Sequence, residues 1–500
     1  MTGSDSFGRL LLAEWTKLRS VRRWVLALFG AAALSVLLSL LVAAASDTDV
    51  NLHPNFVTGP EGKPVSDAFS FVHQPLSGDG TITVRVASAP QPTDPARTLR
   101  GFTATDREPS TAGVMVKESL TPGSRYAAAF VTPDDGVRLQ ANFRDPLTGS
   151  SHTAPQWLRL TRSGDTVTGY ESADGSSWQE IGKVTVPGLP QTAEIGFFVA
   201  SPQQMWIQRS PGTIGATELP VRSTATFDNV SATVSGQWRM DPVVMPVEES
   251  DPSQKPGGPR PPGGEMSEQG GVFTVAGVGK IGPNPPPDDV VEISLFGVLA
   301  GLLTMIAVGA LFMTSEYRRG MIRTSFAASP RRGRVLAAKA VVLGVVAYAV
   351  GLTAAVISVL AAPRVLRTHG FGLPAFPPVS LTEWPVLRTV LLTAAFVAAI
   401  SLFSLGLGAA IRHSAAAITT AIVVVVLPVI VGMALLGPAG EWLARLTPAG
   451  GFATTRSQPP TPLLSEPWAV LSPWAGLGVT CSYAAGSLLL AWWLLRRRDA

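Results

Sequence analysis

Six long stretches of the chain contain no charged residue and no histidine. A helix needs about 20 apolar residues to cross a hydrocarbon core about 30 Å thick, so each stretch predicts one membrane-spanning helix. The alternative is a set of buried helices in one large soluble core, but that reading does not explain why every stretch matches the bilayer thickness. The predicted spans are 24–45, 293–315, 340–362, 389–411, 414–436 and 473–495.

Between the first two spans, in residues 46–292, the pattern changes to alternation with a period of two. Ile82, Val84 and Val86 alternate with polar residues, and stretches 137–143 and 195–199 show the same alternation. Such alternation predicts strands with one buried face. Turn pairs at 79–80, 135–136, 163–164 and 174–175 predict hairpins. An antiparallel β-sandwich is therefore expected over residues 60–236.

Residues 237–290 are rich in proline and glycine, as in 256–264. Such a composition does not bury a core, so a linker is predicted here. Within it, Phe273-Thr274-Val275 is the one segment that favours a short strand.

Basic residues gather beside the apolar stretches, which is typical of a membrane protein rather than of a nucleic-acid binder. Their distribution predicts a multi-pass protein of the cell (plasma) membrane, with both termini cytoplasmic and residues 46–292 extracytoplasmic. A cleaved signal peptide at the N-terminus is the alternative, but the first apolar stretch is too long for one. Residues 1–23 are expected to form an amphipathic helix on the cytoplasmic leaflet. The basic residues assigned to the cytoplasmic side are Arg9, Lys17, Arg19, Arg22, Arg23, Arg318, Arg319, Arg323, Arg331, Arg332, Arg334, Lys339, Arg412, Arg496, Arg497 and Arg498, whereas Arg364, Arg367 and Arg388 fall on the other side.

The amino-acid composition also argues against several classes of protein and of binding site. Only 15% of residues are charged, against about 25% in soluble domains, which argues against one large soluble enzyme. A single cysteine, Cys481, excludes an intrachain disulfide and a cysteine-based zinc site. No cofactor and no metal site is predicted.

The predicted spans lack the ionisable residues that ion-coupled carriers need. The chain also lacks a phosphate-binding loop, since the nearest approach at 274–281 has neither the first glycine nor the final hydroxyl residue. An active transporter would therefore draw its energy from another chain, while a passive channel remains open.

The stretches "GDGTITVRVAS" (78–88), "AGVMVKESLTPGSRYAAAFVTPDDGVRLQ" (112–140), "WLRLTRSGDTVTGYESADGSSWQEIG" (157–182) and "ATFDNVSATV" (225–234) resemble the concanavalin A-like lectin/glucanase (laminin-G-like) jelly rolls. The resemblance implies a jelly-roll sandwich and a glycan as ligand. Trp157, Tyr170 and Trp178 are candidate glycan contacts, although aromatic residues of a sandwich also serve as core. The glucanase carboxylates, Glu-x-Asp-x-x-Glu on one strand, are absent.

The segment 316–339 is polar and basic and lies between the second and third predicted spans. Its "EYRRG" (316–320) and "AASPRRGR" (327–334), together with the opening "AEWTKLRS" (13–20), resemble the permeases of ABC-2 type transporters. In that family an N-terminal elbow helix precedes span one, and a coupling helix after span two meets a separate cytoplasmic ATPase. The resemblance implies an ATPase-coupling role for Glu316, Arg318, Arg319, Gly320, Arg331, Arg332 and Arg334. A second permease chain, identical or not, is also implied.

The sequence thus predicts an α-helical membrane protein with six transmembrane helices, plus an all-β jelly-roll sandwich inserted between helices 1 and 2. The predicted function is the permease subunit of an ATP-driven ABC-2 type exporter, itself not an enzyme, in contact with membrane lipids. A membrane-anchored glycan-binding or sensor protein without transport is the main alternative, and an anchored glycosidase is the second. The substrate is not revealed.

Overall fold

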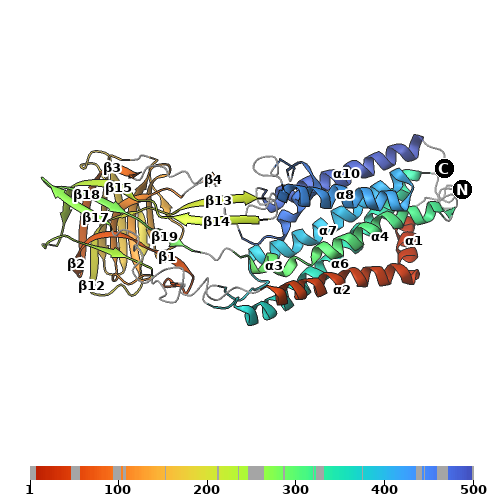
Figure 1. Cartoon of the computed structure of the whole chain (residues 1–500), viewed down its shortest axis with the longest axis horizontal. Helices are drawn as coiled ribbons and strands as arrows, with labels where there is room; N and C mark the ends of the chain where they lie inside the picture. The colour runs from red at the N-terminus through yellow and green to blue at the C-terminus, as the bar shows by residue number, and fades with distance from the viewer. Residues whose placement is uncertain are drawn as a thin grey trace. The chain divides into compact units, whose positions relative to one another are not determined.

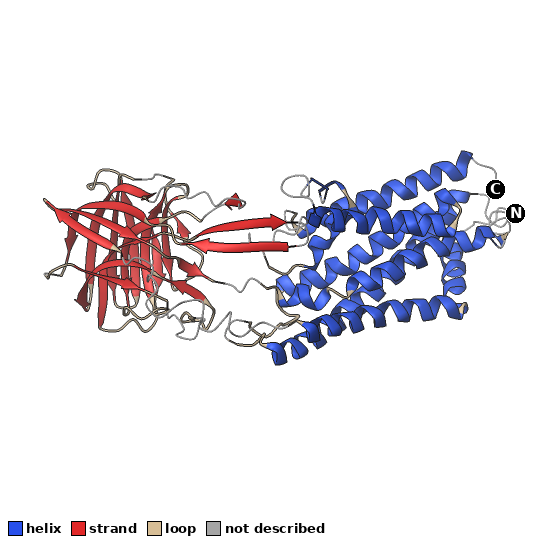
Figure 2. Ribbon diagram, in the orientation of Figure 1, coloured by secondary structure: helices blue, strands red, loops and turns tan. Residues whose placement is uncertain are grey.

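The structure is a computed structural model that describes residues 7–46, 57–93, 103–104, 108–151, 154–210, 213–234, 236–245, 264–284, 288–318, 320–321, 331–373, 376–434, 442–443, 445–458 and 471–497. Its elements separate into two compact units. We call the one that holds the helices the helical unit and the one that holds the large sheets the β unit (Figure 2).

Among the described residues, six helices of the helical unit are long and apolar enough to cross a membrane, which confirms the prediction of six such segments. A helix satisfies its backbone hydrogen bonds internally, as a lipid environment requires. The short helix α1 lies across the end of α2 (Figure 1). The helices of this unit are α1 (Phe7–Ser20), α2 (Arg22–Ala45), α3 (Val290–Leu295), α4 (Val298–Arg318), α6 (Arg332–Leu366), η2 (Arg367–His369), α7 (Trp384–Ile411), α8 (Ser414–Ala434), η3 (Pro448–Thr455) and α10 (Pro473–Arg497).

Small residues allow these helices to approach closely. A Cβ added to Gly297 would lie 1.9 Å from the backbone oxygen of Ser35, and one added to Gly301 would lie 1.9 Å from Ser35 Oγ. A Cβ added to Gly406 would lie 2.4 Å from Ser487 Oγ. These glycines are therefore packing positions, as is common between membrane helices.

The third long helix begins earlier than its sequence indicated. α6 starts at Arg332 instead of Ala340, so the end of the predicted polar loop is helical. The charges of this stretch suggested a loop, but Lys339 is completely buried by partners that the next subsection describes.

The β unit contains two seven-stranded antiparallel sheets, as an alternating pattern predicts. Their strand orders are β11-β10-β9-β3-β15-β18-β17 and β16-β2-β12-β5-β6-β7-β8. Apolar side chains from both sheets, such as Val84, Leu158, Val116 and Phe197, share one buried core, so the sheets pack face to face. The strands are β1 (Val65–Asp67), β2 (Phe69–Ser77), β3 (Gly80–Pro92), β4 (Thr103–Ala104), β5 (Thr111–Lys117), β6 (Tyr126–Thr132), β7 (Gly136–Ala141), β8 (Leu147–Thr148), β9 (Gln156–Ser163), β10 (Thr166–Ser172), β11 (Gln179–Thr185), β12 (Thr192–Ala200), β13 (Gln204–Ser210), β14 (Thr213–Leu219), β15 (Ser223–Ala232), β16 (Arg239–Val243), β17 (Glu265–Gln269), β18 (Val272–Gly277) and β19 (Ile281–Pro283).

The predicted linker 237–290 is too long. Strand β18 pairs with β15, and the side chains of Phe273 and Val275 are buried in the core. The short strand expected at Phe273-Thr274-Val275 is thus an integral part of a sheet, and β17 extends that sheet further. The high proline and glycine content of 237–290 concealed the strands β16, β17, β18 and β19, and apolar residues of β16 and β18 are buried.

Candidate functional site

The predicted coupling segment starts in the last turn of α4 and ends in the first turns of α6. Arg319 and residues 322–330 lie outside the described residues, so the structure describes the two ends of the segment. These ends are near one another, because Glu316 of one end and Lys339 of the other form an ion pair at 2.6 Å.

A cluster of four charged residues, of which Glu14, Glu316 and Lys339 are buried, joins these elements. Lys339 Nζ lies 2.6 Å from Glu316 Oε1 and 2.7 Å from Glu14 Oε2. Lys17 Nζ lies 2.7 Å from Glu14 Oε1 and 3.2 Å from Glu316 Oε1. The Lys339 side chain is fully buried, and its ammonium also lies 4.7 Å from the centre of the Phe312 ring. We call Glu14, Lys17, Glu316 and Lys339 the ion cluster.

The two acids and two bases of the ion cluster balance in charge, which a buried site requires. Breaking one partner of a buried ion pair leaves an uncompensated charge and costs several kcal/mol. Because Glu14 belongs to α1, Glu316 to α4 and Lys339 to α6, the ion cluster holds these three helices together. Both described ends of the coupling segment are therefore fixed to α1.

The predicted coupling residues fall into two groups. Glu316 is buried in the ion cluster and cannot offer its side chain to a partner. Arg318, Gly320 and Arg331 are exposed, and Gly320 has the positive φ, 68°, that favours glycine after a helix end. The other two are half-buried: Arg332 donates a hydrogen bond to the Leu495 carbonyl at 3.0 Å, and Arg334 lies two residues further along α6.

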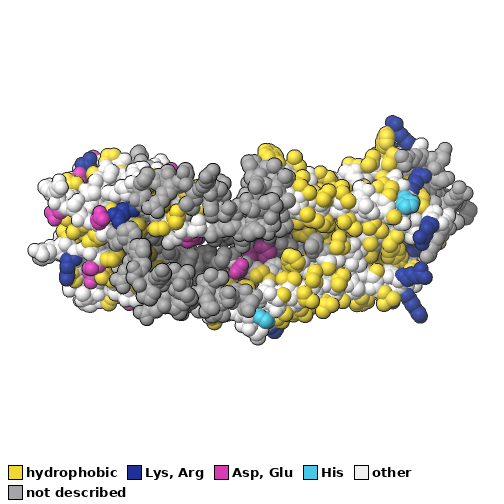
Figure 3. All heavy atoms as spheres, viewed as in Figure 1, with side chains coloured by type: hydrophobic (Ala, Val, Ile, Leu, Met, Phe, Trp, Pro, Cys, Tyr) yellow, Lys and Arg dark blue, Asp and Glu magenta, His cyan; other side chains and the backbone are white. Residues whose placement is uncertain are grey.

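The end of the helical unit that carries the ion cluster is strongly basic. Figure 3 shows Lys and Arg side chains gathered along this end. By their positions in the chain, Arg331 stands at the start of α6, Arg412 follows the end of α7 and lies over the Tyr317 ring of α4, and Arg496 stands at the end of α10.

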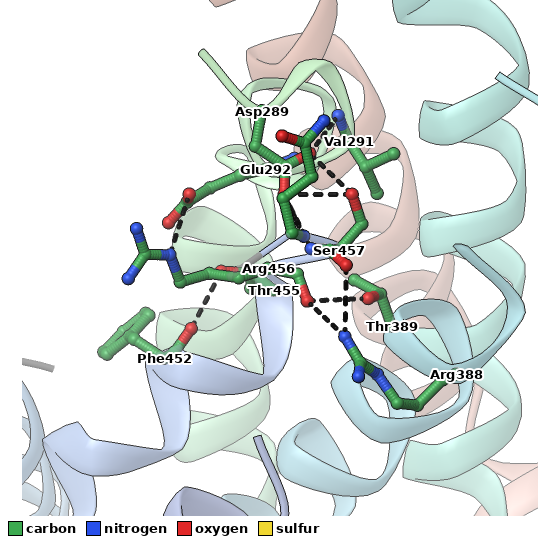
Figure 4. A network of polar contacts seen from close by, with 10 residues as sticks. Asp289, Val291, Glu292, Arg388, Thr389, Phe452, Thr455, Arg456 and Ser457 are labelled. Atoms are coloured by element: carbon green, nitrogen blue, oxygen red, sulfur yellow. Dashed lines mark hydrogen bonds and ion pairs between the residues drawn. The ribbon is translucent and has the colours of Figure 1, made fainter. Parts of the chain in front are cut away.

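A second polar network lies at the other end of the helices (Figure 4). Asp289 caps α3 by accepting from the amides of Val291 and Glu292, and it also accepts from the amide and hydroxyl of Ser457 at 2.6–3.0 Å. Arg456 Nε lies 3.2 Å from a Glu292 carboxylate oxygen. α3 is thereby joined to the segment that follows η3.

The same segment is held to α7. Arg388 donates to the backbone oxygens of Arg456 and Ser457, and the Thr389 hydroxyl donates to the Arg456 oxygen. We did not identify this network from the sequence. Its signal was weak, consisting of Asp289 and Glu292 directly before an apolar run and Arg456 between two runs.

The candidate glycan contacts of the β unit share one face of a sheet. Trp157 and Arg159 occupy alternate positions of β9, on the side away from the core. Tyr170 on β10 is the register partner of Arg159. The guanidinium of Arg159 stacks on Trp178, 3.7 Å from its ring centre. All three aromatic residues are half-buried and none belongs to the core cluster between the sheets.

Four glutamates of the β unit, none of which forms the glucanase pattern, have separate partners. Glu171 is buried and accepts from the amide and hydroxyl of Ser150, at 2.8 and 2.5 Å. Glu194 lies 2.7 Å from His73. Glu118 pairs with Arg125, and Glu180 lies 3.9 Å from Lys183. Each of these glutamates therefore has a polar partner of its own.

Comparisons with known proteins add little to this description. No family model and no curated protein matches the chain. Among solved structures, a functionally unknown protein from Saccharomyces cerevisiae is similar with 16% identity and a TM-score of 0.21, over 33% of this chain and 74% of that one. SCP-B, a member of the eqolisin family of peptidases solved with the tripeptide Ala-Ile-His, is similar with 10% identity and a TM-score of 0.22, over 42% of this chain and 98% of that one. Similarities at this level carry no conclusion about fold or function.

Proposed function

We propose that this chain is the membrane-spanning permease subunit of an ATP-driven exporter of the ABC-2 type. Six helices of bilayer length support a multi-pass membrane protein. The basic end of the helical unit supports an orientation in which that end, both termini and the coupling segment are cytoplasmic.

The observation that carries the proposal is the ion cluster at the two ends of the coupling segment. Arg318 and Arg331 are exposed beside it, while Glu316 and Lys339 tie the segment to α1 and α6. A force applied to the exposed arginines would reach α1, α4 and α6 together, because the buried pairs resist separation. This is the mechanical connection that a transporter without its own ATPase site needs.

In this proposal Glu316 is a positioning residue, and Arg318 and Arg331 contact the acidic surface of a separate ATPase subunit. ATP hydrolysis takes place on that partner chain, and a second permease chain completes the pathway. The β unit lies on the extracytoplasmic side as a concanavalin A-like jelly roll between the first two spans.

The test is recovery of an ATPase with the full-length protein from its native membranes in mild detergent. The proposal expects a co-purified protein that carries a phosphate-binding loop and hydrolyses ATP. Arg318→Glu together with Arg331→Glu should reduce its recovery at least tenfold. Arg367→Glu is the matched control, since Arg367 is also exposed but caps the opposite end of α6. Equal recovery from all variants would refute the coupling role.

A second candidate function is glycan binding by the β unit, alone or alongside transport. The face that carries Trp157, Tyr170 and the stacked pair Arg159–Trp178 favours it, because sugars stack on aromatic rings. Binding of the full-length protein to a glycan array, lost in Trp178→Ala and kept in a variant of another half-buried aromatic residue, Trp238→Ala, would support it. No binding to any glycan would count against it.

A further inference from the structure

One face of the sheet β16-β2-β12-β5-β6-β7-β8 carries a second buried cluster, separate from the core between the sheets. It is largely aromatic, with Phe69, Phe71, Tyr126 and Phe198 among its members. Into this apolar cluster the chain inserts two opposite charges, Asp67 at the end of β1 and Lys117 at the end of β5. Neither side chain is exposed at all.

The two side chains touch. Lys117 Nζ lies 2.7 Å from Asp67 Oδ2, and the ammonium is 5.9 Å from the Phe69 ring centre and 5.6 Å from that of Tyr126. Moving a carboxylate and an ammonium out of water costs several kcal/mol for each ion, and their attraction often does not repay this. A neutral covalent product would remove that cost.

The hydrogen bonds around the pair fit an amide better than they fit two ions. The amide of Gly123 donates to Asp67 Oδ2 at 2.7 Å, whereas no described residue donates to Oδ1. Lys117 Nζ also donates to the Ser124 carbonyl at 3.3 Å. An amide between the side chains needs one donor to its oxygen and one acceptor for its N–H, and Gly123 and Ser124 supply these two.

We propose that Lys117 and Asp67 condense within the folded β unit to form an intramolecular isopeptide bond. The Nζ lone pair attacks Cγ of Asp67, and Oδ2 remains as the amide oxygen, held by the Gly123 N–H. The Cγ–Oδ1 bond breaks, and Oδ1 leaves as water with two protons from the lysine ammonium. The third proton stays on the new amide nitrogen and faces the Ser124 carbonyl. The step is a dehydration and needs neither an oxidant nor a reductant.

The surroundings favour the neutral forms that react. Burial lowers the pKa of Lys117 and raises the pKa of Asp67, against the attraction between the two charges. Burial also holds the pKa of Tyr126 well above its usual range, so that phenol keeps its proton. The other charged group that acts on Lys117 is Glu118, and its carboxylate is paired with Arg125.

Such a bond would stabilise a part of the chain that has no cysteine and hence no disulfide. The single cysteine of the sequence, Cys481, lies in α10 of the helical unit. The bond would join β1, near the start of the β unit, to the end of β5 and close a covalent loop through the chain between them. Crosslinks of this kind stabilise mainly by restricting the unfolded chain.

The test is the mass of the purified full-length protein, measured intact under denaturing conditions. The proposal expects a mass lower than the sequence mass by one water molecule, and a branched peptide in the digest that joins the segments around Lys117 and Asp67. A protein at the full sequence mass, with Lys117 found as an ordinary unmodified residue, would overturn it.

Two variants make the assignment specific. Asp67→Asn should lose ammonia instead of water and reach the same final mass as the wild-type protein, because both routes give the same amide. Lys117→Arg should show the full sequence mass, because a guanidinium is not an effective nucleophile at neutral pH. A mass deficit that persists in Lys117→Arg would show that the water is lost elsewhere and would overturn the proposal. The masses are read on denatured chains, so a variant of low stability can still be measured.

Discussion

Replacement of Lys339 by methionine tests the structural role of the ion cluster. The variant keeps the length and the apolar stem of the side chain but leaves Glu14 and Glu316, each nearly fully buried, without the fully buried base that both contact. Removing one partner of a buried ion pair costs about 3–5 kcal/mol. Lys17 remains within 2.7 Å of Glu14 and 3.2 Å of Glu316. We therefore expect the free energy of unfolding to fall by an amount near the lower end of this range, about 3 kcal/mol.

The assay is the unfolding free energy of the purified protein in mixed micelles, with Lys17→Met as the matched control. Lys17 contacts the same two carboxylates, but its side chain is 44% exposed, so its loss should cost about 1 kcal/mol or less. Glu14→Gln and Glu316→Gln, added to Lys339→Met, should restore most of the stability, because no buried charge is then left unpaired. Equal losses in the two lysine variants would refute the reasoning.

Three further predictions concern other parts of the chain. Asp289→Ala removes the cap of α3 and the contacts to Ser457. It should lower the free energy of unfolding by about 2 kcal/mol and speed hydrogen exchange of the Ser457 amide. Unchanged exchange at that amide would contradict this. Gly297→Ala should lower the melting temperature by several degrees because its Cβ meets the Ser35 backbone, whereas Gly478→Ala, which faces open space in α10, should not. Backbone hydrogen bonds from Ser177 and Ser176 lower the pKa of Asp174 well below its usual range, so its stabilising effect is present above the ordinary aspartate pKa of about 3.9 and is lost as the pH falls through the lower, folded value. The stability difference between wild type and Asp174→Ala should therefore shrink below pH ~4, and a difference that grows on acidification would contradict the assignment.

The regular elements were predictable where one physical requirement dominates. An uncharged run such as 389–411 has few alternatives to a long helix, and α7 contains it entirely. Period-two alternation at Ile82, Val84 and Val86 likewise gave a strand with these three side chains buried. In both cases the pattern is local, and local patterns are visible in one sequence.

The polar sites were less predictable because their partners are distant in the chain. Lys339 stands 325 positions from Glu14 and 23 from Glu316, and in the sequence it looks like one more basic residue of a loop. This is why α6 was expected to begin too late. Asp289 and Ser457 are 168 positions apart, so nothing in the sequence alone indicates that they meet.

The charged pair in the β unit shows the same limit. Asp67 and Lys117 lie 50 positions apart, each at the end of a strand, where a charge is usually solvated. Their burial results from the way β1 and the turn before β6 cover the aromatic cluster. Only the folded chain shows that the two groups share one dry site.

The most direct test of the proposed function is site-specific photo-crosslinking in native membranes. A photoreactive amino acid is placed at position 318 in one protein and at position 367 in another. We expect position 318 to crosslink to a cytoplasmic ATPase with a phosphate-binding loop, and position 367, at the other end of α6, not to do so. An ATPase crosslinked from position 367, or none from position 318, would contradict this expectation.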